Sequence, residues 1–359
     1  MENYKKIIIL TVFLLILINL WAEEEKAFAF YPFGAYSDET SVFLGSYALY
    51  TFRPENLPEN YKPASLELNL IVSYKKQIRT LLRNNIYLAD GKYSIGIPLR
   101  YYLWPTTFYA VGNQVNTELK EDYTRQYFEF YPYFQYHLNK IISFSTSLYL
   151  EQSKITKSET DNDLLNKEVM GYKDYQLMGI GFGLNRDTTD RGYFPTAGSS
   201  LTYQVQLYHK YIGSDFSFRK STFDYRRYVS ISQSQTFAGQ FLLKTVSGDV
   251  PFEKLPDLGS EMRGFDSHKY INDQIFMLRI EDRIFPWHKS YWQRFGLALF
   301  LETGQTMPSF SELCLNKQKY AAGLGLRFIM LPLQKLTLRF DFAFSEDGYE
   351  MDIISFEAF

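Results

Sequence analysis

Hydrophobic and polar residues alternate along most of this chain. Between Lys335 and Phe344 the even positions carry Leu, Leu, Phe, Phe and Phe, whereas the odd positions carry Lys, Thr, Arg, Asp and Ala. Side chains of a strand point alternately to its two faces, so the segment predicts a strand with one apolar and one polar face. The apolar face can lie against a second sheet or against lipid.

Similar alternation, interrupted by turn residues, predicts about sixteen antiparallel strands. The predicted strands cover residues 27–35, 41–52, 64–74, 76–88, 92–102, 122–136, 140–152, 174–186, 198–210, 214–231, 234–247, 273–285, 292–303, 318–331, 334–344 and 350–359. The longest connections follow odd-numbered strands: 103–121, 153–173, 248–272 and 304–317. Most turns after even-numbered strands are short, with exceptions at 53–63 and 187–197. This asymmetry is typical of a bacterial transmembrane β-barrel.

The first 22 residues have the pattern of a secretory signal peptide. Lys5 and Lys6 precede an apolar run over residues 7–20, and Ala22 offers a small residue for cleavage. We therefore expect cleavage after Ala22 and a barrel domain over residues 23–359. An uncleaved anchor is the less favoured alternative, because the apolar run is shorter than the ~20 residues that a spanning helix needs.

Composition narrows the class of protein. No other apolar run is long enough to span a membrane as a helix, whereas 18% aromatic residues fit a barrel with aromatic girdles. A water-soluble β-sandwich would show similar alternation and stays open as an alternative. The net charge of -2 argues against a nucleic-acid partner. Cys314 is the only cysteine, so no intramolecular disulfide can form.

The sequence shows no catalytic or metal-binding pattern. The histidines lack a second ligand at metal spacing, and no G-x-S-x-G segment occurs. These histidines are His137, His209, His268 and His288. We therefore predict no enzyme activity, no cofactor and no metal site.

Three segments carry candidate motifs: a proline-containing turn, the tip of the longest loop, and a strand whose leucines share one face. Their residues are Phe194, Pro195, Thr196 and Gly198 in the turn, Met262, Arg263, Gly264 and Phe265 in the loop, and Gly296, Phe300, Glu302 and Gly304 in the strand. Proline fixes φ and glycine permits a left-handed corner, so the turn should enter the next strand rigidly. Glu302 lies opposite the leucines, which predicts a lumenal carboxylate that needs a partner.

In this order the three segments resemble motifs of the BamA/TamA-like outer-membrane superfamily, the bacterial surface antigen type of barrel. The turn resembles the family's periplasmic turn. The loop resembles its loop-six tip, with Met262 in place of the usual Val or Leu. The strand resembles its G-x-x-x-F-x-D-x-G pattern, with Glu302 in place of Asp. The resemblance implies a sixteen-stranded barrel with loop six folded into the lumen and Arg263 held inside.

We therefore predict a charge-assisted pair between Arg263 and Glu302 that pins loop six. The alternation of the neighbouring strand places three more charged residues on its lumenal face: Arg279, Glu281 and Arg283. We expect them to extend this network. The pair and its neighbours form the candidate functional site.

The resemblance also implies a function: assisting the insertion or translocation of proteins or lipids at the outer membrane, as a barrel-only member without periplasmic POTRA modules. Expected partners are outer-membrane lipids and unfolded protein or lipid clients. Phe359 resembles the terminal strand signal of barrel proteins, so the chain is itself expected to be a client of the outer-membrane assembly machinery. A passive transport channel or a structural barrel is the alternative function.

Overall fold

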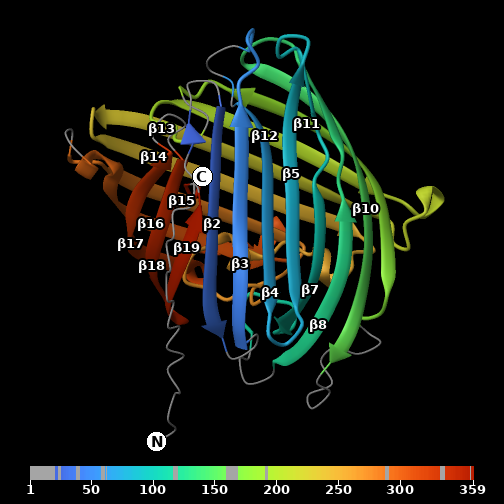
Figure 1. Ribbon diagram of the computed structural model, residues 1–359. Helices are drawn as coiled ribbons and strands as arrows, with labels where there is room; N and C mark the ends of the chain where they lie inside the picture. The colour runs from blue at the N-terminus through green and yellow to red at the C-terminus, as the bar shows by residue number, and fades with distance from the viewer. Residues whose placement is uncertain are drawn as a thin grey trace, which may run out of the picture.

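The computed structural model describes residues 21–22, 26–37, 41–57, 61, 63–115, 120–158, 169–190, 193–287, 291–331, 336–355 and 357–359. Within them the chain forms one antiparallel sheet that curves into a barrel (Figure 1). The predicted all-β antiparallel barrel is thus confirmed. The predicted signal peptide lies outside the described residues, apart from Trp21 and Ala22.

The sheet contains nineteen strands among the described residues. In chain order they are β1 (Trp21–Ala22), β2 (Lys26–Ser37), β3 (Ser41–Phe52), β4 (Ala64–Ser73), β5 (Ile78–Leu88), β6 (Tyr93–Gly96), β7 (Leu99–Phe108), β8 (Glu121–Phe130), β9 (Tyr133–His137), β10 (Ile142–Ser158), β11 (Tyr175–Asp187), β12 (Gly198–Tyr208), β13 (Phe218–Ser232), β14 (Gln235–Gly248), β15 (Gln274–Ile284), β16 (Phe295–Met307), β17 (Lys319–Leu331), β18 (Leu336–Ser345) and β19 (Gly348–Ser355).

Two predicted strands are each split in two by a proline. The predicted strand 92–102 becomes β6 and β7 around Pro98, and 122–136 becomes β8 and β9 around Pro132. β5 pairs with β7 near its start and with β6 near its end, and β10 pairs with both β8 and β9. Proline has no N–H to donate, so it interrupts the ladder. These breaks and the two-residue β1 account for the difference from the predicted strand number.

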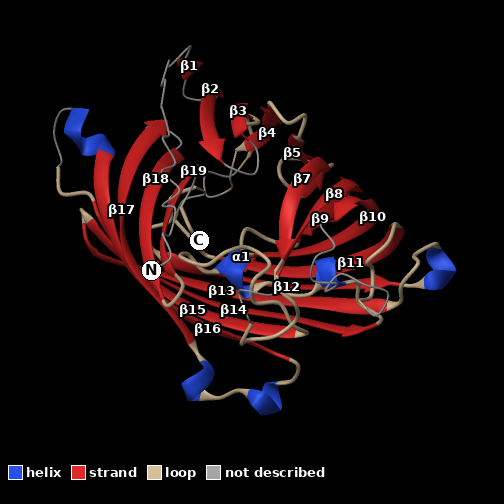
Figure 2. Cartoon of the chain, turned by 90° about the horizontal axis from the view of Figure 1, so that it is seen from below, coloured by secondary structure: helices blue, strands red, loops and turns tan. Residues whose placement is uncertain are grey.

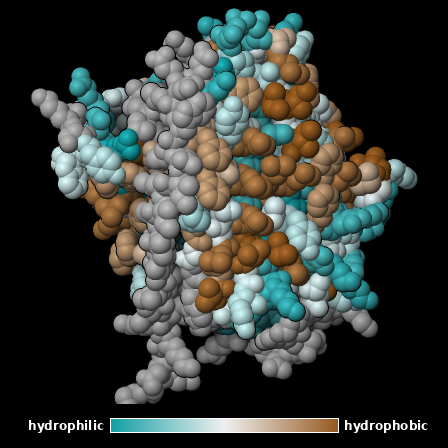
Figure 3. Space-filling view, in the orientation of Figure 1, coloured by the Kyte–Doolittle hydropathy of each residue, from teal (hydrophilic) through white to brown (hydrophobic). Residues whose placement is uncertain are grey.

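Alternating faces of the strands separate lipid-facing from lumenal side chains. In β16 the leucines Leu297, Leu299 and Leu301 are 42%, 56% and 56% exposed, whereas Glu302 is only 3% exposed. The prediction that Glu302 lies opposite the leucines is therefore confirmed. Apolar side chains gather across the outer face in front of the viewer in Figure 3, as expected of a wall that meets lipid.

Loop six, residues 249–273 between β14 and β15, carries the helix that lies inside the ring of strands (Figure 2). This helix is α1 (Leu258–Glu261), and the short 3-10 helices are η1 (Lys210–Ile212), η2 (Phe252–Lys254), η3 (Tyr291–Arg294), η4 (Phe310–Glu312) and η5 (Leu315–Lys317). None of the helices in the described part of the chain has the length and apolarity needed to cross a membrane.

The end of the chain differs from the prediction. The last strand, predicted over 350–359, ends at Ser355, and Phe359 is only 4% exposed. Phe359 packs with Tyr228 of β13 and Ala238 of β14 inside the barrel. Because this lumenal seat buries the aromatic ring, residues 357–359 leave the sheet rather than extending β19.

Candidate functional site

The tip of loop six is seated by apolar packing. Met262 and Phe265 are each 3% exposed and pack in one cluster with Leu258 of α1 and Met277 of β15. Gly264 between them adopts φ 81°, a conformation that glycine tolerates best. The packing therefore fixes the backbone on both sides of Arg263.

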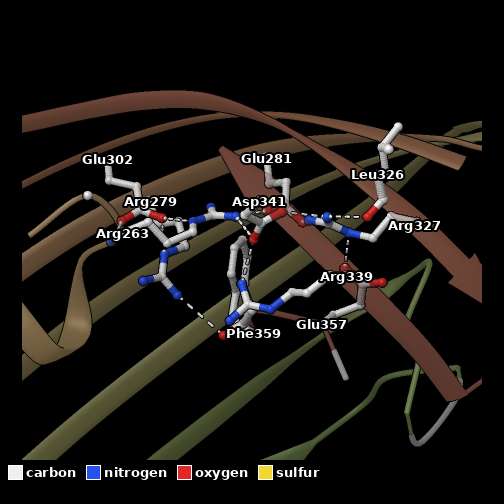
Figure 4. A network of polar contacts seen from close by, with 12 residues as sticks. Arg263, Arg279, Glu281, Glu302, Leu326, Arg327, Arg339, Asp341, Glu357 and Phe359 are labelled. Atoms are coloured by element: carbon white, nitrogen blue, oxygen red, sulfur yellow. Dashed lines mark hydrogen bonds and ion pairs between the residues drawn. The ribbon is translucent and has the colours of Figure 1, made fainter. Parts of the chain in front are cut away.

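Arg263 is held by three buried carboxylates (Figure 4). Its Nε lies 2.5 Å from Glu302 Oε1, and its backbone N–H donates to Glu302 Oε2 at 2.9 Å. Its Nη1 donates to Glu281 at 2.8 Å and to Asp341 at 2.9 Å. The guanidinium carbon lies 3.4 Å from the centre of the Phe300 ring. The structure thus brings Arg263 and Glu302 together.

Charge in this site is balanced by direct contact. Burial disfavours the charged Arg263 guanidinium, but Glu302, Glu281 and Asp341 together hold its pKa above the ordinary value. A buried ion pair gives little net stability compared with apolar residues, yet removing one partner is costly. The arrangement therefore specifies where the loop tip sits.

Two glycines of the strand motif make room for neighbours. A Cβ at Gly304 would lie 2.7 Å from Leu258 Cδ1 and 2.7 Å from the Phe276 carbonyl oxygen. A Cβ at Gly296 would lie 2.7 Å from the Phe285 ring. Gly304 thus permits the close approach of α1 to β16.

The network continues along the wall formed by β15 to β18. Arg279 Nε lies 2.8 Å from Glu302, and Arg283 Nε donates to Glu281 at 2.8 Å. Arg327 of β17 donates to Asp341 of β18 at 2.6 Å. The sequence analysis did not assign Arg327, Asp341 or Arg339 to the site. Their signal was available, because all three lie on the polar face of alternating strands.

Residues 357–359 bind to the same wall. Arg327 Nε donates to Glu357 at 2.9 Å, and Arg283 Nη2 donates to the Phe359 carbonyl oxygen at 3.0 Å. The Arg283 guanidinium carbon lies 5.1 Å from the centre of the Phe359 ring. The predicted role of Phe359 as a strand signal stays a prediction.

A second cluster, which the sequence analysis missed, holds the start of loop six. It consists of Arg125, Glu151, Glu253 and Lys254. Arg125 of β8 lies 2.9 Å from Glu151 of β10 and 2.8 Å from Glu253 of η2. Lys254 pairs with Glu151. Loop six is therefore attached to the barrel wall at two separate places.

His268 joins this second cluster from the far end of loop six. Its Nε2 lies 3.6 Å from Glu253 and its Nδ1 lies 3.9 Å from Asp257. Burial lowers the pKa of His268, but the close carboxylate of Glu253 outweighs it, and the pKa is raised. Burial likewise opposes the charged form of Glu253, but Arg125 and His268 lower its pKa to about 2. Both groups therefore favour their charged forms.

The predicted periplasmic turn reaches the base of the first network. Phe194 is 5% exposed, and its ring meets that of Phe285 edge to face at 5.2 Å. Pro195, next to Phe194, is also buried. The Thr196 hydroxyl donates to Asp190 at 2.5 Å. Gly198 adopts φ 98°, and a Cβ there would lie 2.2 Å from the Thr188 carbonyl oxygen, so the corner requires glycine.

No group of three or more His, Cys, Asp or Glu side chains among the described residues is arranged to hold a metal ion. The contacts described above make the site a charged anchor of loop six, built from guanidinium–carboxylate pairs.

Comparison with known proteins places this geometry in a family. The model of the Omp85 superfamily domain matches residues 64–358. BamA from Haemophilus ducreyi lacking POTRA domains 1-3 is similar in structure, with 18% identity and a TM-score of 0.59 over 93% of this chain and 70% of that one. No curated protein sequence matches.

Two CdiB structures are similar as well. CdiB from Acinetobacter baumannii has 10% identity and a TM-score of 0.59, over 93% of this chain and 60% of that one. CdiB from Escherichia coli has 13% identity and a TM-score of 0.58, over 94% of this chain and 62% of that one. The chain thus spans less than two thirds of either CdiB. The predicted resemblance is confirmed: this chain belongs to the Omp85 superfamily and is an outer-membrane barrel.

Proposed function

We propose that this barrel assists the insertion or translocation of proteins or lipids at the outer membrane. The observation that supports this role best is the anchoring of the loop-six tip inside the lumen, through Arg263 and Glu302. A loop fixed there by buried charges narrows the lumen. A narrowed lumen fits a barrel that handles its clients at the strands of its wall better than it fits a wide pore. Family membership supports the same general role.

In the proposed mechanism the barrel opens where the first and last strands of the sheet meet. An exposed strand edge offers unpaired N–H and C=O groups, which can template an incoming strand. Outer-membrane lipids and unfolded protein or lipid clients are the proposed partners. The assembly machinery would act on this chain as on other barrel clients.

A passive transport channel is the second candidate function. A cavity of about 380 Å³ favours it, because its lining includes polar and aromatic residues of several strands and turns, among them Tyr87, Gln135 and His137. Planar-bilayer conductance separates the two candidates. A lumen held by loop six should give small, unsteady openings, and a channel a large and steady current.

Quantitative proteomics of outer-membrane fractions after depletion tests the leading proposal. We expect several other barrels or surface lipoproteins to fall, and re-expressed wild type to restore them. The Arg263→Ala variant should fail to restore them, while Arg83→Ala should succeed, because the Arg83 side chain is 50% exposed in its pair with Glu67. An unchanged outer membrane after depletion would contradict an assembly role and favour the channel.

A further inference from the structure

One end of the lumen contains a cavity of about 380 Å³ that the proposed assembly function does not use. It lies where β5, β9, β10, β11 and β12 reach the end of the barrel that carries the predicted periplasmic turn. Its volume falls within the range of about 300–1,000 Å³ that is typical of sites for small ligands. The cavity therefore has room for a small molecule or for one part of a larger one.

Two unusually long turns contribute to this cavity. The turns at 53–63 and 187–197 are the exceptions in the predicted series of short turns. Each supplies a tyrosine to the lining, Tyr61 from the first turn and Tyr193 from the second. The extra length of both turns thus brings aromatic rings to one end of the lumen.

Tyrosine rings and an imidazole line the cavity. The rings of Tyr61, Tyr87 and His137 lie 5.0–5.9 Å apart, centre to centre. The Tyr133 ring also belongs to the lining, and its hydroxyl donates to Asn85 Oδ1 at 3.1 Å. An aromatic ring of this kind offers a flat apolar face next to a polar edge. The cavity therefore combines flat apolar surface with groups that form hydrogen bonds.

A row of uncharged polar side chains crosses the strands in the same cavity. Strand pairing places His137 next to Ser143, Ser143 next to Asn185, and Asn185 next to Thr202. All four line the cavity. Within the part of the chain that the structure describes, no side-chain hydrogen bond occupies Asn185 or Thr202. Their amide and hydroxyl groups are therefore open to a ligand.

The charged side chains of the lumen gather elsewhere. β15 to β18 carry the arginines and carboxylates around Arg263, and β17 and β18 lie across the ring of strands from β10 and β11 (Figure 2). The charged side chains among the described lining residues of the cavity are Lys140, Arg186 and Asp187, and all three are exposed. Arg186 and Asp187 are also hydrogen bonded to neighbouring side chains. Since a buried charge needs a partner, the cavity favours an uncharged ligand.

We propose that this cavity binds an uncharged sugar ring. The C–H groups on the face of a sugar pack on aromatic rings, and its hydroxyls exchange hydrogen bonds with amides and hydroxyls. Tyr61 and Tyr87 supply the rings, and Asn185 and Thr202 supply the polar groups. Two sources offer such a ring: a soluble oligosaccharide, or a periplasmic glycan built from N-acetylated amino sugars. The inference goes beyond the proposed assembly function and does not depend on it.

Saturation-transfer NMR on the assembled barrel in lipid nanodiscs, free of sugar-based detergents, tests the site. The probes are maltotriose and triacetylchitotriose, which are uncharged, and trigalacturonate, a charged trisaccharide. We expect at least one uncharged probe to bind, and trigalacturonate to bind at least about tenfold more weakly, because its carboxylates lose water without gaining a buried partner. Tighter binding of maltotriose identifies a soluble oligosaccharide as the source, and tighter binding of triacetylchitotriose identifies the amino-sugar glycan.

Matched variants locate the bound sugar. Asn185→Leu and Thr202→Val should each weaken binding roughly 2- to 10-fold, because each removes one neutral hydrogen-bonding group. The control Asn69→Leu makes the same change as Asn185→Leu on the lumenal face of β4, where Leu68 and Leu70 face outward. Asn69 lies outside the lining and its variant should bind as the wild type does. The electrophoretic mobility of unheated samples shows which variants are folded.

Three results would overturn the sugar site. The first is that neither uncharged probe binds, and the second is that trigalacturonate binds as tightly as they do. The third is that every folded variant of Asn185 and Thr202 keeps the wild-type affinity. Because binding is measured on the isolated barrel, it is independent of the depletion experiment. An unchanged outer membrane after depletion would contradict the assembly function and leave the sugar site standing.

Discussion

At the scale of single residues, Arg263 is the side chain that joins loop six to the carboxylates of the site. Its side chain is 4% exposed and Glu302 is fully buried, so each needs the other to remain charged inside the protein. The contact fixes both the position and the orientation of the loop tip, since Glu302 also accepts the Arg263 backbone N–H.

A double-mutant cycle should show this dependence. Arg263→Ala or Glu302→Ala alone should each lower the free energy of unfolding by about 3–5 kcal/mol, because an unpaired charge stays buried. The double variant should cost clearly less than the sum. Urea unfolding of the reconstituted barrel measures the three values, and additive losses would refute the pair.

The second cluster should make loop six sensitive to pH. His268 has a raised pKa, so its contribution is complete below about 6.5 and is lost as the pH rises through the raised value. Glu253 has a pKa lowered to about 2, so its contribution is complete above about 4.5 and is lost as the pH falls towards 2. Asp257 and Arg125 are the other charged groups facing His268.

Protection of loop six from added protease should therefore be greatest between about pH 4.5 and 6.5. In His268→Gln, protection should no longer fall above about pH 6.5, but it should still fall below about pH 4.5. His209→Gln is the control, because His209 lies in the loop between β12 and β13. An identical decline in wild type and His268→Gln would show that another group titrates.

At the scale of elements, the strand motif on β16 serves the docking of α1. A Cβ at Gly304 would collide with both Leu258 and a backbone oxygen. α1 can therefore lie this close to β16 only because position 304 is a glycine. Phe300 provides the ring beneath Arg263, and Glu302 the charge. β16 thus leaves room for α1 at Gly304, places the Phe300 ring against Arg263, and carries the carboxylate that pairs with Arg263.

Gly304→Ala should displace α1 while leaving the barrel assembled. Overpacking of this kind costs about 1–3 kcal/mol, which should appear as faster proteolysis within loop six. Gly239→Ala on β14 is the matched control, because the nearest atom to its Cβ would be 3.8 Å away. Equal proteolysis of the two variants would mean that the strand does not limit the approach of the helix.

At the scale of the whole molecule, one network joins the middle of the chain to residues 357–359. Glu281 contacts Arg263 of loop six and also Arg283 and Arg327, the two arginines that hold residues 357–359. The loop brings a positive charge to this wall and Glu357 a negative one. Each should therefore favour the docking of the other.

Arg263→Ala and Glu357→Gln should consequently show a coupling of about 0.5–3 kcal/mol in unfolding experiments. The control pairs Arg263→Ala with Glu67→Gln on β4, where losses should add. Additivity in both cycles would show that loop six and residues 357–359 dock independently.

The sequence by itself determined the class of fold and the loop anchor. Period-two alternation separated lipid-facing leucines from Glu302, because strand geometry projects neighbouring side chains to opposite faces. The contact of Arg263 with Glu302 was proposed because both segments resemble family motifs and because alternation places Glu302 in the lumen. The lumenal place of Glu302 follows from local geometry, whereas the place of Arg263 follows from the resemblance.

Only the tertiary structure decided how the sheet ends meet. Alternation records on which side of its own strand a residue lies, and it does not say what covers that side. Tyr47 thus lies on the lumenal face of β3 and Leu338 on the outer face of β18, yet both belong to one apolar cluster. For the same reason the sequence assigned Phe359 to a strand over 350–359, whereas in the structure its ring lies inside the barrel against Tyr228 and Arg283.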